Sequence, residues 1–489
     1  MGNRVTIDPI TRLEGHGKIE IFLKDDGSVD NVFFQVPELR GFEKFAEGRP
    51  VEELPRITSR ICGVCPEAHS TASAKACDAV YGVTLPPTAA KLRELQYSVF
   101  YVGDHTTHFY ALGGPDFVMG PDAPPALRNI IGVIGKVGVE LGKEVIRTRL
   151  EAHEIAGMLG GKRVHPVNLI PGGMSKGLCN PNDHKRVLEI TERFVEFAKL
   201  TQKILADIVL ANKDYVDLIV SDPYKLVVNN MGLVDANNKV NFYDGKVRVT
   251  GVDGKEICKY APSEYLDNVA EHVEPWSYLK FPYLKKLGWK GFVEGAGTSI
   301  YRATPLSRLN ASDGMATPLA QAEYEKMYAT LGGKPVNSTL ATHWARCIEL
   351  LYAAERAYEL ARDPEITGPD YRVIPTAIPK EGVGIVEAPR GTLTHHYVTD
   401  EKGIVVRANL IVGTTNNNAP ICMSIKKAAQ GLIKAGKDIT EPMLNMVEMA
   451  FRAYDPCFGC ATHSLPGQMP LVVNLRSADG TLIRSISRN

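Results

Sequence analysis

The sequence of 489 residues lacks the features that mark several specialised classes of protein. Lys plus Arg and Asp plus Glu number 56 each, so the formal net charge is zero, which argues against a general binder of nucleic acid or other polyanions. There is no run of about 18 apolar residues that could span a membrane, and the first residues carry no apolar secretory core. We therefore expect a cytoplasmic protein with no membrane span and no nucleic-acid partner.

Internal repeats, low-complexity tracts and Gly/Ser linkers are also absent, so composition gives no clean domain boundary. Helical patterns dominate and strand patterns occur in local pairs, which favours an α+β fold over a doubly wound sheet. We predict a helix-dominated single large domain with a bundle of long helices and peripheral antiparallel hairpins. The expected helices cover about 66–80, 88–112, 126–158, 183–215, 317–331, 337–362 and 439–453, and the strand-rich patches cover 3–36, 240–260 and 383–412.

Cysteine is the first informative residue type. There are nine, and four of them form two C-x-x-C pairs, Cys62 with Cys65 and Cys457 with Cys460. In a long neutral chain this pattern indicates metal-binding or redox thiols rather than a disulfide framework. Two such pairs can form a four-thiolate metal site. Five cysteines fit no motif and are expected to be small core residues: Cys77, Cys179, Cys258, Cys347 and Cys422.

The pairs alone leave three kinds of site open: a structural zinc site, a thiol redox pair and a catalytic site for a soft metal. In the usual zinc ribbon the two halves are about 15–20 residues apart. Here they lie at opposite ends of the chain. This spacing weakens the zinc-ribbon interpretation and favours a site in the middle of the fold, which the fold itself holds together.

The surroundings of the two pairs resemble those in the large subunit of nickel–iron hydrogenases. Residues 60–69 match the pattern R-x-C-G-x-C-x-x-x-H, and residues 455–463 match D-P-C-x-x-C-x-x-H. Other family-like segments follow in the expected order, at 8–16, 40–43, 104–110, 165–173, 301–306 and 387–391. The resemblance covers about residues 5–463. It implies the family's large-subunit fold over 1–463 and a C-terminal extension over 464–489.

The sequence Cys-Gly-Val-Cys-Pro-Glu-Ala-His within the first motif is similar to the cytoplasmic multisubunit branch of this family. It most resembles the archaeal, viologen-reducing enzymes of methanogenesis that do not reduce the deazaflavin coenzyme. An NAD(P)-linked bidirectional hydrogenase subunit is one alternative. A noncatalytic scaffold with a structural zinc ion on the same four cysteines is another. The homologous subunit of respiratory complex I lacks these cysteines, which disfavours that interpretation.

The resemblance implies a nickel–iron centre held by the four motif cysteines. Cys62 and Cys457 would be terminal nickel ligands, and Cys65 and Cys460 would bridge nickel to an iron that carries one CO and two cyanides, Fe(CO)(CN)2. Soft thiolates suit such metals. Four thiolates and two cyanides carry six negative charges, and Ni²⁺ and Fe²⁺ together carry four positive ones. The core is therefore left with a charge of about −2 and requires cationic and hydrogen-bonding neighbours.

The resemblance also assigns catalytic roles. Arg390 matches the family arginine above the open metal position, and Asp104 and Asp455 match the carboxylates that hold it; Asp455 could alternatively cap a helix end. We expect Arg390 to polarise dihydrogen while Cys457 accepts the proton. Glu14 matches the glutamate that takes the proton onward, because a carboxyl group in an apolar shell has a raised pKa and can relay protons.

Three further residues match positions around the centre. His69 is expected to donate a hydrogen bond to a bridging sulfur, although it could also be a satisfied core histidine. Thr414 and Thr415 match the position at which a hydroxyl group hydrogen-bonds a cyanide. This sequence has Gly-Thr-Thr there, where many relatives have proline before the hydroxyl residues.

A second metal site is implied behind the centre. Glu43, the backbone carbonyl of Leu410 and His463 match the ligands of a Mg²⁺ ion, or of another divalent ion in some relatives. Mg²⁺ prefers oxygen ligands and retains water, so a histidine ligand is unusual.

The partners follow from the same resemblance. No cysteine set is left for an iron–sulfur cluster in this chain, so electrons must pass to an obligate iron–sulfur small subunit. From there they would continue to further electron-transfer subunits, such as a heterodisulfide-reductase-type or flavin module. A maturation endopeptidase is expected to cut between His463 and Ser464. The removed tail carries a hairpin pattern at 471–475 and 481–483.

Overall fold

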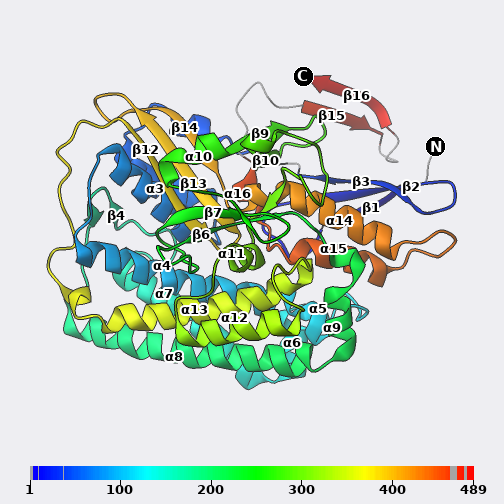
Figure 1. Ribbon diagram of the computed structural model, residues 1–489, viewed down its shortest axis with the longest axis horizontal. Coiled ribbons are helices and arrows are strands. Elements are labelled where there is room, and N and C mark those ends of the chain that lie inside the picture. The colour runs from blue at the N-terminus through cyan, green and yellow to red at the C-terminus, as the bar shows by residue number, and fades with distance from the viewer. Residues whose placement is uncertain (1–3, 9, 37, 463–470, 478–481, 489) are drawn as a thin grey trace.

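The computed structural model describes residues 4–8, 10–36, 38–462, 471–477 and 482–488 (Figure 1). Long helices lie together along one side of the molecule, and small sheets with shorter helices cover the other side (Figure 1). Strands are mostly paired with neighbours in the sequence. The predicted α+β class with a long-helix bundle and peripheral hairpins is therefore confirmed.

The bundle is built around α13 (Thr342–Arg362), which packs against α4 (Pro87–Thr107), α8 (Pro181–Leu205) and α12 (Pro318–Thr330), while α7 (Val139–Gly160) packs on α4 and α8. All residues of α13 from Thr342 to Glu355 are buried, because helices surround it. The other helices are α1 (Phe42–Ala46), α2 (Leu54–Thr58), α3 (Pro66–Val80), α5 (Pro115–Val118), α6 (Ile130–Val137), α9 (Lys213–Val220), α10 (Tyr265–Asn268), α11 (Pro305–Ala311), α14 (Asn418–Leu432), α15 (Glu441–Arg452) and α16 (Phe458–Ala461).

Three predicted helices are shorter than expected. The helix predicted at 126–158 breaks between α6 and α7 at Gly138, whose φ of 99° is readily adopted only by glycine. α4 and α8 each end in a π-helical turn, His108–Gly113 and Ala206–Leu210. Such turns are rare and have no sequence signal of their own. α14 was not predicted, because turn-forming residues at its start hide the beginning of the helix.

The three predicted strand-rich patches are confirmed as sheets. The N-terminal one is the meander β1 (Arg4–Ile7), β2 (Lys18–Leu23) and β3 (Val29–Gln35), and another is β12 (Glu381–Ala388), β13 (Gly391–Thr399) and β14 (Val405–Ile411). The middle patch forms β7 (Lys246–Thr250) and β8 (Glu256–Tyr260), with β6 (Asn229–Val234) and β11 (Tyr301–Arg302) added. β11 pairs with β6 in parallel, an exception to the antiparallel expectation. Short pairs complete the set: β4 (Leu169–Ile170), β5 (Gly173–Met174), β9 (Val269–Val273), β10 (Lys280–Leu284), β15 (Leu471–Arg476) and β16 (Leu482–Arg488).

α3 lies very close to β12, and two glycines allow this contact. A Cβ atom on Gly384 would lie 2.1 Å from the carbonyl oxygen of Ala72, and one on Gly382 would lie 2.3 Å from the amide nitrogen of Val80. α3 begins directly after Cys65, and β12 leads to Arg390. The close packing therefore brings the first cysteine pair and the arginine to the same place.

The two ends of the domain also meet. The Phe34 ring of β3 lies 5.5 Å from the Phe451 ring of α15 and 5.0 Å from the Phe458 ring of α16, between centroids. The amide of Phe458 donates to the carbonyl oxygen of Glu14 at 3.0 Å. These contacts carry the second cysteine pair to the N-terminal segment.

The C-terminal extension forms the predicted hairpin, in which β15 pairs with β16 in antiparallel register. The predicted boundary between His463 and Ser464 lies outside the described residues, so the two-part division of the chain stays a prediction. Within the part that the structure describes, no helix is both long enough and apolar enough to cross a membrane.

The five unassigned cysteines are not all core residues. Cys77, Cys347 and Cys422 are buried as predicted. Cys258 is only partly buried and Cys179 is exposed, so the prediction is wrong for Cys179. It lies in the turn before α8, where the chain runs over the surface.

Candidate metal centre

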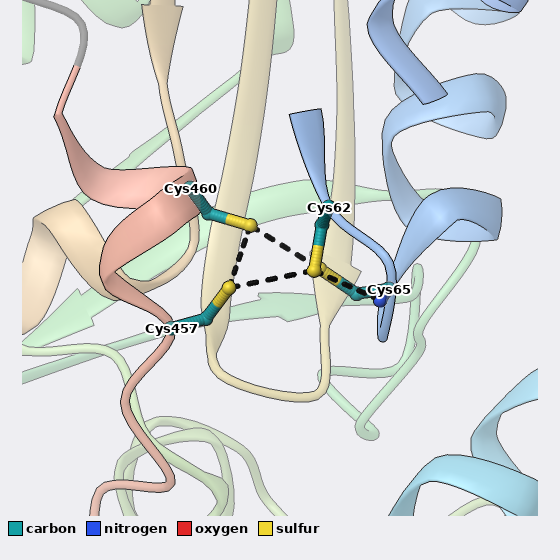
Figure 2. Close-up of side chains that lie close together, drawn as sticks. All are labelled: Cys62, Cys65, Cys457 and Cys460. Atoms are coloured by element: carbon teal, nitrogen blue, oxygen red, sulfur yellow. Dashed lines mark hydrogen bonds between the residues drawn. The ribbon is translucent and has the colours of Figure 1, made fainter. Parts of the chain in front are cut away.

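The four motif cysteines converge in the interior, as Figure 2 shows. Their sulfur atoms all lie within 4.8 Å of one another, and no side chain of the four is more than 5% exposed. The Sγ atoms of Cys62 and Cys457 are 3.4 Å apart, and those of Cys65 and Cys460 are 3.5 Å apart. No other group of three or more His, Cys, Asp or Glu side chains with this geometry occurs among the described residues. The four cysteines are therefore positioned to bind metal.

Local structure sets the direction of each sulfur. Cys62 and Cys65 flank a loop that ends at Pro66, the first residue of α3, where a missing amide proton is tolerated. The amides of Val64 and Cys65 donate to Cys62 Sγ at 3.2 and 3.1 Å, so the loop curls around this sulfur. Cys457 directly precedes α16, and Cys460 lies within it.

Arg40 joins the two cysteine loops. Its Nη1 donates to the carbonyl oxygens of Ile61, at 2.5 Å, and of Gly459, at 3.2 Å, each next to a motif cysteine. No role was predicted for Arg40, although it begins the family-like segment 40–43. That segment was the available signal. One arginine thus cross-links residues from the two ends of the chain.

The thiols differ in their tendency to ionise. Hydrogen bonds from its neighbours, Cys457 first, lower the pKa of Cys62 well below its usual range. Burial raises the pKa values of Cys457 and Cys460 well above theirs. A cation in the middle of the four sulfurs would be needed to keep all of them as thiolates, and binding it would release protons.

Arg390 lies above the cysteines and is held by both predicted carboxylates. Its Nη1 is 2.9 Å from Asp104 Oδ2, and its Nη2 is 2.9 Å from Asp455 Oδ2. All three side chains are buried. Burial alone would lower the pKa of Arg390, but the two carboxylates outweigh it and keep the pKa well above its usual value. A permanent positive charge therefore faces the four sulfurs.

A small cavity lies between the arginine and the sulfurs. Its lining includes Cys65, Cys457, Cys460, Arg390, His69 and Thr414. His69 Nε2, Thr415 Oγ1 and Arg390 Nε are buried without a hydrogen-bond partner among the described residues. A soft-donor set, a fixed cation and unused polar atoms around one small space fit an anionic metal centre with small polar ligands.

Of the predicted cyanide and sulfur donors, Thr414 and His69 line this cavity, and Thr415 follows Thr414 in the chain. Thr414 Oγ1 accepts from the amide of Cys457 at 3.1 Å, and Thr415 is buried beside it. His69 Nδ1 is 3.2 Å from His395 Nε2. Burial lowers the pKa of His69 to about 4, so the ring is neutral and carries one N–H.

Glu14 contacts Cys457, the cysteine from which it was predicted to take the proton. The Cys457 thiol donates to Glu14 Oε2 at 2.9 Å, and the Gly459 amide donates to the same oxygen at 3.0 Å. Burial, followed by the charge of Cys62, raises the pKa of Glu14. Glu14 is only partly buried, so it connects the sulfur to a more exposed region.

The predicted second metal site is brought together in part. Glu43 is buried, and its Oε1 accepts from the amide of Leu410 at 2.8 Å, so the recorded contact uses the Leu410 N–H rather than its carbonyl. The Lys280 ammonium lies 3.7 Å from Glu43 and 3.4 Å from Glu271. Burial raises the pKa of Glu43 to about 7. His463 lies outside the described residues.

Comparison with known proteins agrees with this geometry. A sequence profile described as nickel-dependent hydrogenase matches residues 40–126 and 143–463, and a second profile described as HoxL-like matches residues 4–39. Together they include the four cysteines, Glu14 and Arg390.

Three relatives match over almost their whole length. An iron-sulfur subunit of the F420-non-reducing hydrogenase of Archaeoglobus profundus is 51% identical, over 99% of this chain and 99% of its own. A subunit of the F420-non-reducing hydrogenase of Methanothermobacter thermautotrophicus is 40% identical, over 99% and 100%. The beta subunit of the NAD-reducing hydrogenase HoxS of Cupriavidus necator is 39% identical, over 100% of both chains.

Solved structures share the fold. An NAD+-reducing [NiFe]-hydrogenase in the H2-reduced state superposes with a TM-score of 0.88 at 36% identity, covering 94% of this chain and 99% of that one. The [NiFeSe]-hydrogenase of Dm. baculatum gives a TM-score of 0.74 at 26% identity, covering 95% and 100%. The chain therefore belongs to the nickel-dependent hydrogenase family and is the catalytic large subunit of a nickel–iron hydrogenase.

Proposed function

We propose that the chain cleaves and forms dihydrogen at a nickel–iron centre with an Fe(CO)(CN)2 unit, and that it delivers the electrons to an iron–sulfur small subunit. The observation that carries this proposal is Arg390, suspended by two buried carboxylates over a cavity lined by the motif cysteines. Cys62 and Cys457 would hold nickel alone, and Cys65 and Cys460 would be shared between nickel and iron. The family resemblance carries this division, since the shortest sulfur contact, 2.7 Å between Cys457 and Cys460, joins one ligand of each kind.

When bound, the centre polarises dihydrogen, breaks the H–H bond heterolytically and takes up the electron pair. Arg390 orients the substrate, because its charge is fixed and its two carboxylates prevent it from turning away. Cys457 Sγ receives the proton and passes it to Glu14 Oε2, which lies 2.9 Å away. A carboxyl group with a raised pKa can accept this proton and release it again.

Buried polar atoms that lack a hydrogen-bond partner among the described residues would hold the small ligands of the iron. Thr414 lines the cavity, and the neighbouring Thr415 is buried, with an Oγ1 that has no partner among the described residues. His69 uses its free Nε2 toward a bridging sulfur. An unsatisfied buried polar atom lowers the free energy of unfolding by about 1–3 kcal/mol. We therefore expect ligands of the bound centre to act as hydrogen-bond partners at these positions.

Electrons leave on the side of the first cysteine pair. Gly63, between Cys62 and Cys65, is exposed and Val64 is partly exposed, whereas residues 451–460 around the second pair are all buried. Exposed apolar side chains lie nearby on α7 and the following loop: Ile146, Leu150, Val164 and Val167. A pocket lined by Gly63, Val64 and Val164, and also by charged residues such as Arg149 and Arg163, opens on this face. We place the iron–sulfur small subunit here, because clustered exposed apolar residues mark interaction sites.

The proposed docking face can be tested by a single substitution that introduces a charged side chain into it. Leu150→Glu should weaken co-purification of the small subunit, whereas Leu319→Glu, an exposed position on α12, should not. Equal retention of the small subunit by both variants would reject the proposed face.

The physiological complex belongs to the archaeal F420-non-reducing type, in the cytoplasm, with further electron-transfer subunits such as a heterodisulfide-reductase-type or flavin module. The identity of 51% to the Archaeoglobus profundus protein, against 39% to the NAD-reducing one, supports this assignment. The alternative is an NAD(P)-linked bidirectional enzyme. Hydrogen-dependent reduction of NAD(P)+ by the purified complex would favour the alternative.

Two proposals concern positions near residue 463. Glu43, the Leu410 carbonyl and His463 hold Mg²⁺ or another divalent ion, and the meeting of Glu43 with Leu410 supports this. A maturation endopeptidase removes residues 464–489 after metal insertion. The mass of the native protein tests the cleavage, since removal of the tail would leave His463 as the last residue.

The central experiment is an infrared spectrum of the native protein together with its metal content. Bands in the metal-carbonyl and cyanide region, with nickel and iron present, are expected, since no side chain or zinc–thiolate site absorbs there. A blank spectrum from tail-free protein that is full of zinc would instead favour the noncatalytic scaffold. That rival needs the four sulfurs but gives no reason for Arg390, Asp104 and Glu14 to surround them.

A further inference from the structure

Arg308 on α11 is a fully buried arginine with no part in the chemistry described so far. Its Nε and Nη2 donate to the two carboxylate oxygens of Glu349, both at 2.6 Å. Its Nη1 donates to Glu387 Oε2 at 3.0 Å and to the carbonyl oxygen of Ala388 at 2.9 Å, and its Nη2 also donates to that of Pro389 at 3.3 Å. A guanidinium group has five N–H donors. Each one has an acceptor here.

Two of these acceptors are the main-chain carbonyls directly before Arg390. On the other side, the Asn417 side chain donates to the Arg390 carbonyl oxygen at 2.8 Å. Gly391 follows with a φ of 143°, and a Cβ atom there would lie 2.2 Å from the carbonyl oxygen of Gly413. The backbone that carries Arg390 is therefore fixed on both sides.

Glu349 on α13 connects the same clamp to the partner of Arg390. Besides the two bonds from Arg308, its Oε2 is 2.9 Å from His105 Nε2. His105 follows Asp104 in α4, and Asp104 binds Arg390 Nη1. One buried carboxylate is thus linked through Arg308 to the chain before Arg390 and through His105 to the helix that carries Asp104.

We propose that the Arg308–Glu349 pair positions the Arg390 guanidinium against Asp104 and the four cysteines. This inference rests on the proposed role of Arg390. A buried ion pair that served stability alone could be replaced by apolar side chains of similar volume. Here such a replacement would remove the donor that Arg308 supplies to the carbonyls of Ala388 and Pro389. Lysine keeps the charge but has three donors and no planar fork, so it cannot satisfy all five acceptor positions.

The test measures hydrogen oxidation per bound nickel in the complex. Arg308→Lys should lower it by at least about 10-fold, because small displacements of a positioning group can cost up to ~10²-fold. In an Arg390→Lys background the same change should cause no further loss, since its effect passes through Arg390. Arg93→Lys is the matched control. Arg93 is equally buried, pairs with Asp78 at 2.5 Å and donates to the Gly173 carbonyl, and its variant should keep normal turnover per nickel.

Hydrogen exchange of the metal-free full chain supplies a readout that does not depend on activity. Backbone amide hydrogens in peptides covering 386–392 should exchange faster in Arg308→Lys than in the wild type, and at the wild-type rate in Arg93→Lys. Glu349→Gln, which removes one acceptor oxygen without changing size, should give the same pattern if Arg308→Lys does not accumulate.

Two results would overturn the positioning role. One is wild-type hydrogen exchange over 386–392 in Arg308→Lys, and the other is that Arg308→Lys lowers turnover by the same factor in the wild type and in the Arg390→Lys background. Failure of the proposed function would look different. In that case the wild-type complex would bind no nickel or turn over no hydrogen. Normal turnover in Arg308→Lys alongside impaired turnover in Arg390→Lys would reject the positioning role alone.

Discussion

Three charges meet above the sulfur atoms, and their balance explains why the arginine stays in place. Arg390 contributes one positive charge, while Asp104 and Asp455 can contribute two negative ones. Burial raises the pKa of Asp455 to about 7, which eases this excess. Breaking a buried pair by removing one partner costs about 3–5 kcal/mol, so each member holds the others.

Arg390→Lys should leave the metal content unchanged and lower hydrogen turnover by at least ~10²-fold. A lysine retains the charge but cannot contact both carboxylates with one planar group. The measurement is turnover per nickel with an artificial acceptor, next to the infrared spectrum. Near-normal turnover would remove Arg390 from the mechanism.

Glu14→Gln should block the proton path without dismantling the site. Glutamine can still accept from the Gly459 amide, now at 3.0 Å from the carboxylate, but it cannot take a proton from Cys457. General acid–base groups contribute about 10²–10⁴-fold, so a loss of that size in turnover is expected at normal nickel content. Glu14→Asp keeps the carboxyl group and should retain part of the activity. If Gln and Asp variants behave alike, the proton leaves elsewhere.

Most residues that the sequence predicted lie within short motifs, although Arg40 in the segment 40–43 was missed. Cys62, Cys457 and Arg390 were predicted because each is embedded in several characteristic neighbours. Arg308 and Glu349 were not, since their partnership depends on how α11 and α13 pack, and no local pattern reports that.

Among the elements, α3 and β12 matter most, because one begins at Cys65 and the other leads to Arg390. α3 was predicted at its observed bounds from periodicity and from the helix-stop glycine, whereas β12 was predicted only as part of the strand-rich patch 383–412. Their close contact was not predicted, because a glycine in a strand pattern can mark a bulge, a bend or a close approach, and does not say which backbone approaches. The breaks at 107, 137 and 205 were missed, since a π turn or a single glycine barely disturbs an apolar period.

Gly384→Ala should separate these two elements. The added methyl group would lie 2.1 Å from the Ala72 carbonyl and 2.4 Å from the Ala76 amide, and neither backbone atom can yield easily. Overpacking of this kind costs about 1–3 kcal/mol, so the midpoint of thermal unfolding should fall. Gly135→Ala in α6 is the control. No atom lies within 4 Å of a Cβ there, so that variant should be neutral or slightly more stable. Equal midpoints would show that α3 can move without cost.

At the scale of the whole molecule, the site depends on the meeting of the two chain ends. Arg40 and Glu14 from the first segment contact Gly459 and Cys457 from the last. The spacing of the cysteine pairs predicted a site inside the fold, and the family resemblance predicted its ligands. Neither could predict the buried surroundings of the site, where burial lowers the pKa values of four histidines: His69, His105, His108 and His343.

His343 makes the consequence for pH measurable. Its ring is buried against His108 and Phe117, with centroids 5.5 and 5.6 Å away, and burial lowers its pKa to about 3. Below pH ~6.5 the unfolded chain binds a proton at this residue and the folded chain does not, down to about pH 3. Stability therefore falls as the pH falls through this window, by about 1.4 kcal/mol per pH unit from this group.

His343→Phe should remove that contribution, so that urea unfolding between pH 4.5 and 6.5 depends less steeply on pH than in the wild type. Phe117→Leu is a suitable control, since it disturbs the same packing without removing a titrating group. It should shift the unfolding free energy by a similar amount at every pH. If His343→Phe keeps the wild-type slope, the folded protein must already protonate His343, and the buried neutral ring would be ruled out. A reduced slope would mean that the bundle beneath the metal centre limits the acid stability of the chain.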